Sequence, residues 1–290
     1  MNVFRRRAMY LLGATAVASG VLVAGASVAG AAPGATCTGD LSNLPSSAGT
    51  LSGNYAGNVR VIGACAVDAG PAVINGNLTV TAGSTLVAAF ASGSLTVKGN
   101  FQIDNGAAVI IGCNPNSFPC VDDQSATSEE TIGGNLTANH PLGLVTHNTT
   151  VSGNLLVHGG GGGVTCGSTP GVFGVFGSPA YIDNEDDTVG GNVVMTGIQS
   201  CWQGTIRVEV GGSVIDTGNT LADPDASEVV GNTISGNIVC NGNSPAVQYG
   251  DSGAAPNTVH GNAIGQCGFD VLQPDPFFDG GGSQPISVKG

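Results

Sequence analysis

The stretch Ile74–Ile103, INGNLTVTAGSTLVAAFASGSLTVKGNFQI, contains the same five-residue pattern twice. Ile74–Leu78 reads INGNL and Val97–Phe101 reads VKGNF, so each copy places a β-branched residue first, glycine third, asparagine fourth and an apolar residue fifth. Apolar and polar residues alternate after each copy, and this period of two predicts β-strands. The Gly-Asn step predicts a corner between two strands, because glycine adopts positive φ freely and asparagine tolerates the left-handed region.

Eight copies of this pattern occur along the chain of 290 residues. They begin at Ile74, Val97, Ile132, Val151, Val189, Val210, Ile234 and Val259. Their fourth positions lie 19 to 38 residues apart, most often in the low twenties, and such a recurring interval is the signature of a solenoid. Strand-corner-strand units of this length predict an all-β fold, a single-stranded parallel β-helix of about eight to ten coils in which like residues stack.

The asparagine at the fourth position is expected to form a ladder along one corner of the helix. Its members are Asn77, Asn100, Asn135, Asn154, Asn192, Asn237 and Asn262, with Ser213 as the one exception. These residues could line a polar binding track. Asparagines that bond the coils above and below account for the pattern without a ligand, so the prediction for the ladder is a structural role.

The N-terminal residues have the layout of a cleaved export signal. Three arginines at positions 5–7 precede an apolar run that ends in Ala29-Gly30-Ala31, so residues 1–31 are expected to be removed, by either the general secretory or the twin-arginine route. The remaining chain is predicted to comprise an N-terminal cap (32–52), the β-helix (53–270) and a C-terminal tail (271–290). It would be secreted or associated with the cell envelope.

Charge and hydropathy exclude two classes of partner. Without the signal, four basic side chains face twenty acidic ones, giving a net charge of −16. A chain of this charge repels nucleic acid, and no apolar stretch beyond the signal reaches membrane-spanning length. The sequence therefore predicts neither nucleic-acid binding nor a mature membrane span, and it leaves an extracellular polysaccharide or an envelope component as the partner.

Eight cysteines follow the signal, and an even number in an exported chain predicts disulfides. They are Cys37, Cys65, Cys113, Cys120, Cys166, Cys201, Cys240 and Cys267. Of the 105 connectivities, pairing between neighbours in the sequence is compatible with a solenoid that mainly contacts its own next coil. No Cys-x-x-Cys and no cysteine and histidine at ligand spacing occur, so no metal site and no cofactor are expected.

The V-x-G-N-apolar pattern, the 49 glycines and the segment Ser235–Cys267 resemble secreted right-handed parallel β-helix proteins of high-GC Gram-positive bacteria, most of them uncharacterised. The coil pattern is more loosely similar to the pectin-lyase-like superfamily and to bactofilins. The resemblance covers about residues 50–268 and implies a right-handed solenoid. It implies no single activity, because this fold hosts polysaccharide lyases, hydrolases, adhesins and polymer-forming proteins.

Two long intervals in the repeat predict excursions from the helix, near residues 113–130 and 159–187. The second interval fits either two coils or one coil with a loop. Insertions in solenoids tend to project from one side and to carry the binding surface. If the protein has a functional site, it is therefore expected on these excursions.

Acidic residues on the excursions are the candidate catalytic or metal-binding groups. Asp122-Asp123 and Asp186-Asp187 resemble the paired aspartates of β-helical polygalacturonases, although that family's Gly-His-Gly and Arg-Ile-Lys motifs are missing. Weak candidates for Ca²⁺ are Asp183, Glu185, Asp223 and Asp225, which lack the spacing of a calcium-binding loop. A solvated acidic surface is the favoured interpretation of all these residues.

The sequence favours a non-catalytic exported rod that acts as a structural, adhesive or surface-binding protein. The alternative is a polysaccharide hydrolase that uses the aspartates on the excursions. Glycoside hydrolysis requires two carboxyl groups about 5 to 9.5 Å apart that face one groove. The two hypotheses therefore differ in where the fold places these carboxyl groups.

Overall fold

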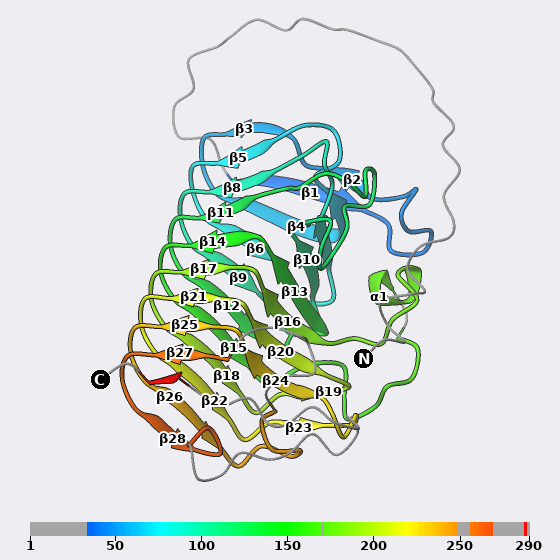
Figure 1. Cartoon of the computed structure of the whole chain (residues 1–290). Coiled ribbons are helices and arrows are strands. Elements are labelled where there is room, and N and C mark those ends of the chain that lie inside the picture. The colour runs from blue at the N-terminus through cyan, green and yellow to red at the C-terminus, as the bar shows by residue number, and fades with distance from the viewer. Residues whose placement is uncertain (1–33, 170, 249–255, 269–286, 289–290) are drawn as a thin grey trace, which may run out of the picture.

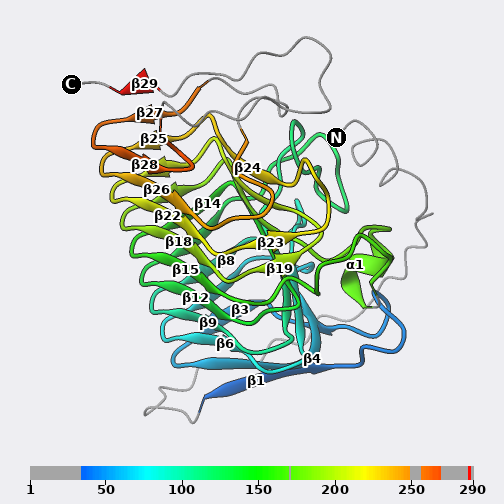
Figure 2. The ribbon, with the colours of Figure 1, turned by 90° about the horizontal axis from the view of Figure 1, so that it is seen from below.

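The chain forms a parallel β-helix with three faces (Figures 1 and 2). The computed structural model describes residues 34–169, 171–248, 256–268 and 287–288, so the predicted signal lies outside the described residues. Every pairing between named strands is parallel, and the third face is a ten-stranded sheet. The prediction of a parallel β-helix is confirmed.

The strands of the three faces alternate along the chain. The first face contains β1 (Ala35–Gly39), the start of β4 (Val59–Ala66), β6 (Leu78–Val80), β9 (Phe101–Ile103), β12 (Leu136–Asn139), β15 (Leu155–His158), β18 (Val193–Thr196), β22 (Val214–Thr217), β26 (Ile238–Asn241) and β28 (Ala263–Gly265). The second face contains β2 (Gly49–Thr50), the end of β4, β7 (Thr85–Ala88), β10 (Ala108–Ile111), β13 (Gly143–His147), β16 (Ile182–Glu185), β20 (Gln203–Ile206) and β24 (Ser227–Val230). The third face contains β3 (Gly53–Tyr55), β5 (Ala72–Ile74), β8 (Leu95–Val97), β11 (Glu130–Ile132), β14 (Thr149–Val151), β17 (Thr188–Val189), β21 (Glu209–Val210), β25 (Thr233–Ile234), β27 (Thr258–Val259) and β29 (Ser287–Val288). Two short strands, β19 (Gln199–Ser200) and β23 (Thr220–Leu221), pair separately.

The core is a column of stacked apolar side chains inside the coils. The apolar residue of each repeat pairs with its counterpart, as Leu78 does with Phe101 and Phe101 with Leu136, and all three are fully buried. Stacking continues before the predicted start of the helix. The segment predicted as a cap, residues 32–52, contains β1 and β2, and both of these strands pair in parallel with β4.

The asparagine ladder runs along the corner between the third and first faces. Each side-chain oxygen accepts a hydrogen bond from the backbone N–H of the next rung, as Asn77 does from Asn100 at 2.8 Å and Asn100 does from Asn135 at 2.9 Å. Ser213 keeps the ladder continuous, because its hydroxyl accepts the N–H of Asn237. The ladder begins one coil earlier than expected, at Asn58, whose copy starts with tyrosine.

The glycine that precedes each rung has a different role from the one predicted. Gly76, Gly99 and Gly134 do not have positive φ. A Cβ atom on Gly134 would lie 2.4 Å from Oδ1 of Asn100 and 2.9 Å from the carbonyl oxygen of Gly99. Glycine is therefore needed at this corner because the coils approach too closely for a side chain, and not because of the backbone conformation.

Polar side chains occupy part of the interior in the later coils. Asp216 on β22 is buried, and its carboxylate accepts hydrogen bonds from Nε2 of Gln203 at 2.7 Å and Nδ2 of Asn219 at 2.8 Å. Burial raises the pKa of Asp216 to about 6, against the smaller opposing effect of these hydrogen bonds. Asn219 also belongs to a second, buried ladder, in which its backbone N–H donates a hydrogen bond to the side-chain oxygen of Asn243 in the next coil.

All eight cysteines form disulfides between neighbours in the sequence. The pairs are Cys37–Cys65, Cys113–Cys120, Cys166–Cys201 and Cys240–Cys267. The first and last pairs connect adjacent coils near the two ends of the described stack. The other two pairs each involve an excursion, so the disulfides fix both the coils and the loops that leave them.

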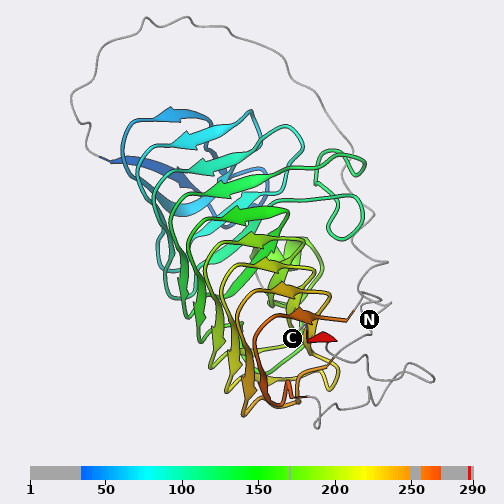
Figure 3. The same cartoon turned by 60° about the vertical axis from the view of Figure 1, so that its left-hand side comes forward.

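Both excursions lie next to the second face. The first, residues 112–129, connects β10 to β11 and stands away from the stack in Figure 3. The second, residues 159–181, connects β15 to β16 and contains the short helix α1 (Val172–Val175), which lies beside the second face in Figure 1. The second long interval is therefore one coil with a loop, and not two coils.

A second hydrophobic core lies outside the coils, between the second face and the excursions. Its centre is Phe173 of α1, which is fully buried together with Val145 of β13. Phe118 of the first excursion packs against Phe176 of the second, with ring centroids 6.1 Å apart. The two loops therefore cover the outer side of the second face together.

Candidate functional site

The outer side of the second face changes from apolar to polar beneath the excursions. Val145 of β13 pairs with Asp183 of β16, and the next outward position pairs His147 with Glu185. The prediction placed Asp183 and Glu185 on an excursion, whereas the structure places both on strand β16. The excursions cover these strands, so the two carboxylates and His147 are buried.

His147, Asp183 and Glu185 form a compact cluster, called here the His147 cluster. Nε2 of His147 lies 3.6 Å from Oδ2 of Asp183, and Nδ1 of His147 lies 3.7 Å from Oε2 of Glu185. The ring of Phe118 stacks on His147, with centroids 4.8 Å apart and planes 12° apart. The first excursion therefore shields one side of the cluster from water.

Aromatic side chains of the next coils lie beside the cluster. Tyr181 and Trp202 meet edge to face, with centroids 5.9 Å apart. Nε1 of Trp202 donates a hydrogen bond to Glu228 at 3.0 Å. The indole lies over Gly204, where a Cβ atom would be 2.3 Å from the Trp202 ring. Glycine at this position thus allows Trp202 to lie against the second face.

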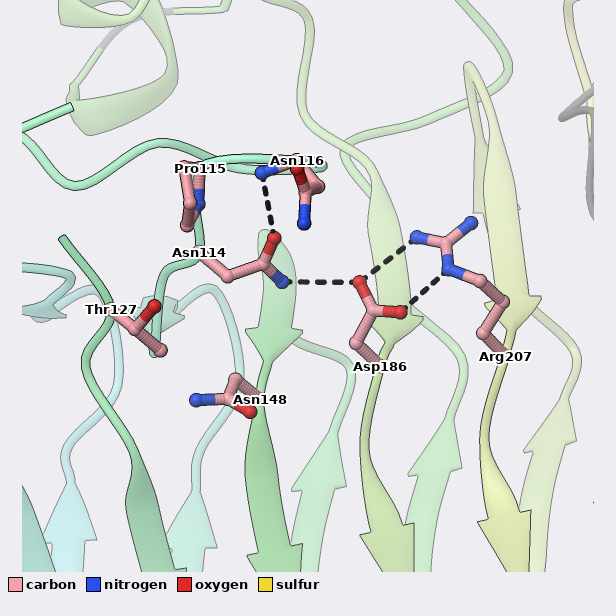
Figure 4. A pocket seen from close by; sticks show the side chains of 7 residues that line it. All are labelled: Asn114, Pro115, Asn116, Thr127, Asn148, Asp186 and Arg207. Carbon is pink, nitrogen blue, oxygen red and sulfur yellow. Dashed lines mark hydrogen bonds and ion pairs between the residues drawn. The ribbon is translucent and has the colours of Figure 1, made fainter. Parts of the chain in front are cut away.

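A pocket opens beside the cluster, at the corner between the second and third faces (Figure 4). Its volume is about 480 Å³, and it is lined by Asn114, Pro115, Asn116, Thr127, Asn148, Asp186 and Arg207. The first four belong to the first excursion, and the last three stand at corners of successive coils. The lining is polar and includes one carboxylate.

Asp186 and Arg207 form an ion pair at the edge of this pocket. The guanidinium donates from Nε to Oδ1 of Asp186 at 2.6 Å and from Nη2 to Oδ2 at 2.9 Å, and it also donates to Glu185. Asn114 and Ser117 of the first excursion donate to Oδ2 as well. Asp186 therefore joins the excursion to the coils.

Three corner residues of the pocket have left-handed backbone conformations. Asn148, Asp186 and Arg207 have φ of 50°, 60° and 55°, whereas the next coil has Gly231 after β24. Asparagine and aspartate tolerate this region, but arginine adopts it at a cost of about 1 to 2 kcal/mol. The chain thus retains a costly backbone conformation where it places the Arg207 guanidinium against Asp186.

Burial, neighbouring charges and hydrogen bonds shift the pKa values of these groups in different directions. Burial raises the pKa of Asp183, and the nearby carboxylates of Glu185 and Asp187 raise it further. Burial lowers the pKa of His147 to about 3, so its imidazole is neutral. At Asp186 burial opposes ionisation, but hydrogen bonds from Arg207, Ser117 and Asn114 outweigh it and hold the pKa below its usual value.

The four aspartates of the alternative, enzymatic interpretation have separate surroundings. Asp122 accepts hydrogen bonds from the backbone of Ala91 and Ser92, and Asp123 accepts from Ser125. Asp187 is buried and accepts from the Thr146 hydroxyl and from the backbone N–H of Thr149. Among these four, Asp186 alone lines the pocket. Asp186 is the one carboxylate among the described residues that line the pocket, whereas glycoside hydrolysis uses two carboxyl groups in one groove.

The weak calcium candidates are also separated. Asp223 and Asp225 lie on the loop between β23 and β24, where the Asp223 carboxylate accepts the backbone N–H of Asp225 at 3.1 Å. Asp183 and Glu185 are joined instead by His147. Cys166, Cys201 and Asp223 also lie close together, but the two sulfur atoms are already bonded to each other.

Sequence reasoning missed His147, Arg207 and Asn114. His147 and Glu185 are 38 positions apart, and Asn114 and Asp186 are 72 positions apart, so no short motif connects them. A register alignment that counted outward-facing positions of each coil would have placed His147 beside Glu185. No comparable signal places Asn114, because the excursion follows no repeat.

Comparison with protein-family models, with curated proteins and with solved structures finds no match for this chain. Among the described residues, no helix has the length and apolar character needed to cross a membrane. The disulfides are consistent with an exported protein. The properties of the pocket and the His147 cluster are therefore the basis for assigning a function.

Proposed function

We propose that this protein is a non-catalytic, exported β-solenoid that binds an extracellular polysaccharide or envelope component at the pocket beside Arg207. The observation that carries the proposal is the state of Asp186, the carboxylate among the pocket residues. Both its oxygens accept hydrogen bonds, and its pKa is held below the usual value. A general acid for glycoside hydrolysis needs a raised pKa and a second carboxyl group in the same groove.

The chemistry of the pocket favours binding of a neutral polar ligand. Asn116 contributes an amide and Thr127 contributes a hydroxyl, whereas the amides of Asn114 and Asn148 already donate to Asp186 and to the Ser128 carbonyl. Amides and hydroxyls both donate and accept hydrogen bonds, which matches the hydroxyl groups of a sugar. The guanidinium of Arg207 is already paired with two carboxylates, so it provides little net attraction for an anion.

The fold holds the surface around the pocket rigidly. Hydrogen bonds of the ladder connect each coil to the next from Asn58 to Asn262. The pocket lies across consecutive coils and is closed by an excursion that a disulfide fixes at Cys113–Cys120. A surface fixed in this way binds without paying a large cost for ordering loops.

A panel of immobilised polysaccharides, scored for both retention and released sugars, tests the proposal. Wild-type protein is expected to be retained by at least one neutral polysaccharide without releasing products. Asn116→Ala, which removes an exposed amide, should weaken retention roughly 3- to 10-fold, the effect of one hydrogen bond. Asn105→Ala is the matched control, because Asn105 is an exposed asparagine on the turn between β9 and β10.

Two results would contradict the proposal. Release of sugars by the wild-type protein would show an enzyme. Equal retention of the wild type and Asn116→Ala, with every polysaccharide that binds, would place the binding surface outside this pocket.

A further inference from the structure

We propose that the His147 cluster is a binding site for one transition-metal dication of the zinc class, with His147, Asp183 and Glu185 as ligands. The inference is independent of polysaccharide binding, because these three side chains are buried and do not line the pocket. The site would fasten β13 to β16 beneath the excursions. It is a structural site, closed to substrates by the residues that cover it.

The three ligands come from adjacent coils whose register brings them together. His147 pairs directly with Glu185 between β13 and β16, and Asp183 lies two positions earlier on the same side of β16. One candidate ligand atom from each residue lies within 4.8 Å of the other two. Ligands bonded to one zinc ion at about 2.0 to 2.2 Å lie roughly 3 to 3.5 Å apart. Side-chain rotations that bring the two carboxylates toward one ring nitrogen of His147 would complete the coordination.

Unpartnered polar atoms point to a missing ligand. Nδ1 of His147 and Oδ1 of Asp183 are buried and have no hydrogen-bond partner. The exposed fractions of these side chains are 2% and 5%. Buried polar atoms are normally satisfied, because an unmade hydrogen bond is costly in the interior. An ion between the imidazole and the carboxylates would provide the missing interaction for both residues.

The charges around the cluster support the same conclusion. Four carboxylates, at positions 183, 185, 186 and 187, lie in one segment of the chain. Among the described residues, the cationic side chain paired with them is Arg207, which binds Glu185 and Asp186. Asp183 faces His147 and not this guanidinium. A dication beside Asp183 would stabilise the ionised carboxylate, with which Arg207 forms no ion pair.

The donor set favours zinc over calcium. Imidazole and carboxylate together suit zinc and its neighbours in the first transition series, whereas Ca²⁺ takes six to eight oxygen ligands. The Arg207 guanidinium holds Glu185 through Oε1, and Oε2 of the same carboxylate faces His147. Arg207 thus orients one ligand in the way that outer-shell residues of metal sites do.

The test uses the purified mature protein with its disulfides formed, stripped of metal with EDTA and then titrated with zinc chloride. We expect one zinc per chain by elemental mass spectrometry after desalting, and a higher thermal midpoint with zinc than without it. His147→Gln is expected to weaken zinc binding at least 10-fold and to abolish the shift in midpoint. His158→Gln is the matched control, because His158 lies on the first face and contacts Thr196.

Zinc-edge X-ray absorption of the wild type provides a measurement that needs no variant. It should show a first shell of nitrogen and oxygen with one imidazole. Failure of the wild type to bind zinc stoichiometrically, equal binding by a folded His147→Gln, or a zinc shell without imidazole would each overturn the proposal. If His147→Gln does not fold, Asp183→Asn and the absorption spectrum decide the question.

Discussion

Gly134→Ala is expected to destabilise the solenoid by about 3 kcal/mol, although the backbone at this position does not have positive φ and is accessible to alanine. The added Cβ would lie 2.4 Å from Oδ1 of Asn100 and 2.9 and 3.0 Å from the carbonyl oxygen and carbon of Gly99. Overpacking of this kind costs about 1 to 3 kcal/mol. Separating the coils would also weaken the hydrogen bond between Asn135 and Asn100, which contributes about 1 kcal/mol.

Gly218→Ala is the matched control, because at Gly218 the backbone conformation disfavours alanine while there is space for the added Cβ. Gly218 has a φ of 68°, and no atom would lie within 4 Å of its Cβ. The cost there is conformational, about 1 to 2 kcal/mol. Thermal unfolding followed by circular dichroism, with the fluorescence of the single tryptophan as a second probe, should give a midpoint about 6 to 12 °C below wild type for Gly134→Ala, and a smaller decrease for Gly218→Ala.

A double variant separates the two contacts. If the clash with Oδ1 of Asn100 dominates, Asn100→Ala combined with Gly134→Ala should be less destabilised than the sum of the two single variants. A Gly134→Ala protein as stable as Gly218→Ala would refute the reasoning, because close approach of the coils would then not explain the glycine of the repeat.

Three further perturbations test other parts of the structure. Asp216→Asn should remove a pH dependence of the free energy of unfolding. The pKa of Asp216 is raised from 3.8 to about 6 in the folded protein, so the protonated carboxyl group stabilises the folded state fully below pH 4. This stabilisation, about 3 kcal/mol in total, is lost as the pH rises from 4 to 6. Urea unfolding of wild type and variant across this range measures the difference, and parallel pH profiles would count against it. Phe173→Ala should lower the free energy of unfolding by about 3 to 5 kcal/mol, because it leaves a cavity at the centre of the outer core. Limited proteolysis should then cleave the second excursion first. Unchanged protection of residues 159–181 would argue that the helix α1 contributes little to the stability of this excursion. Arg207→Gln should destabilise the protein by about 2 to 4 kcal/mol, since Asp186 and Glu185 would lose their cation while partly or wholly buried, and an unchanged unfolding midpoint would mean that the pair is screened by solvent.

The repeat made the fold predictable because each copy is a short run of consecutive residues that can be recognised without knowing any tertiary contact. Residues that alternate with a period of two form strands, and a corner every twenty or so residues allows only stacking of one coil on the next. The ladder and its interruption at Ser213 follow from the same alignment, since stacked positions are equivalent. Pairing of neighbouring cysteines is compatible with the same alignment, but the sequence alone does not select it from the 105 connectivities. Asn58 was missed only because Tyr55 replaces the β-branched residue at the start of its copy.

The role of the repeat glycine could not be read from its pattern. A glycine near a corner suggests positive φ, and Gly197 and Gly218 meet that expectation. Gly134 is present for a different reason, the distance to the coil beneath it. That distance depends on how closely two backbones pack, which the order of residues along one coil does not describe.

The sequence by itself determined a disulfide-bonded β-solenoid with two excursions, because those features depend on periodicity and on cysteine and glycine content. Only the tertiary structure decided what the excursions do. They fold back over the second face, so that Asp183 and Glu185, which alternate along β16 as solvent-facing residues would, are buried against His147. The reason is physical. The loops that bury these outward positions are the first excursion, which lies 54 to 71 residues before Asp183, and the second excursion, which directly precedes β16. No local pattern in the sequence encodes the contact between a strand and a loop from a distant coil.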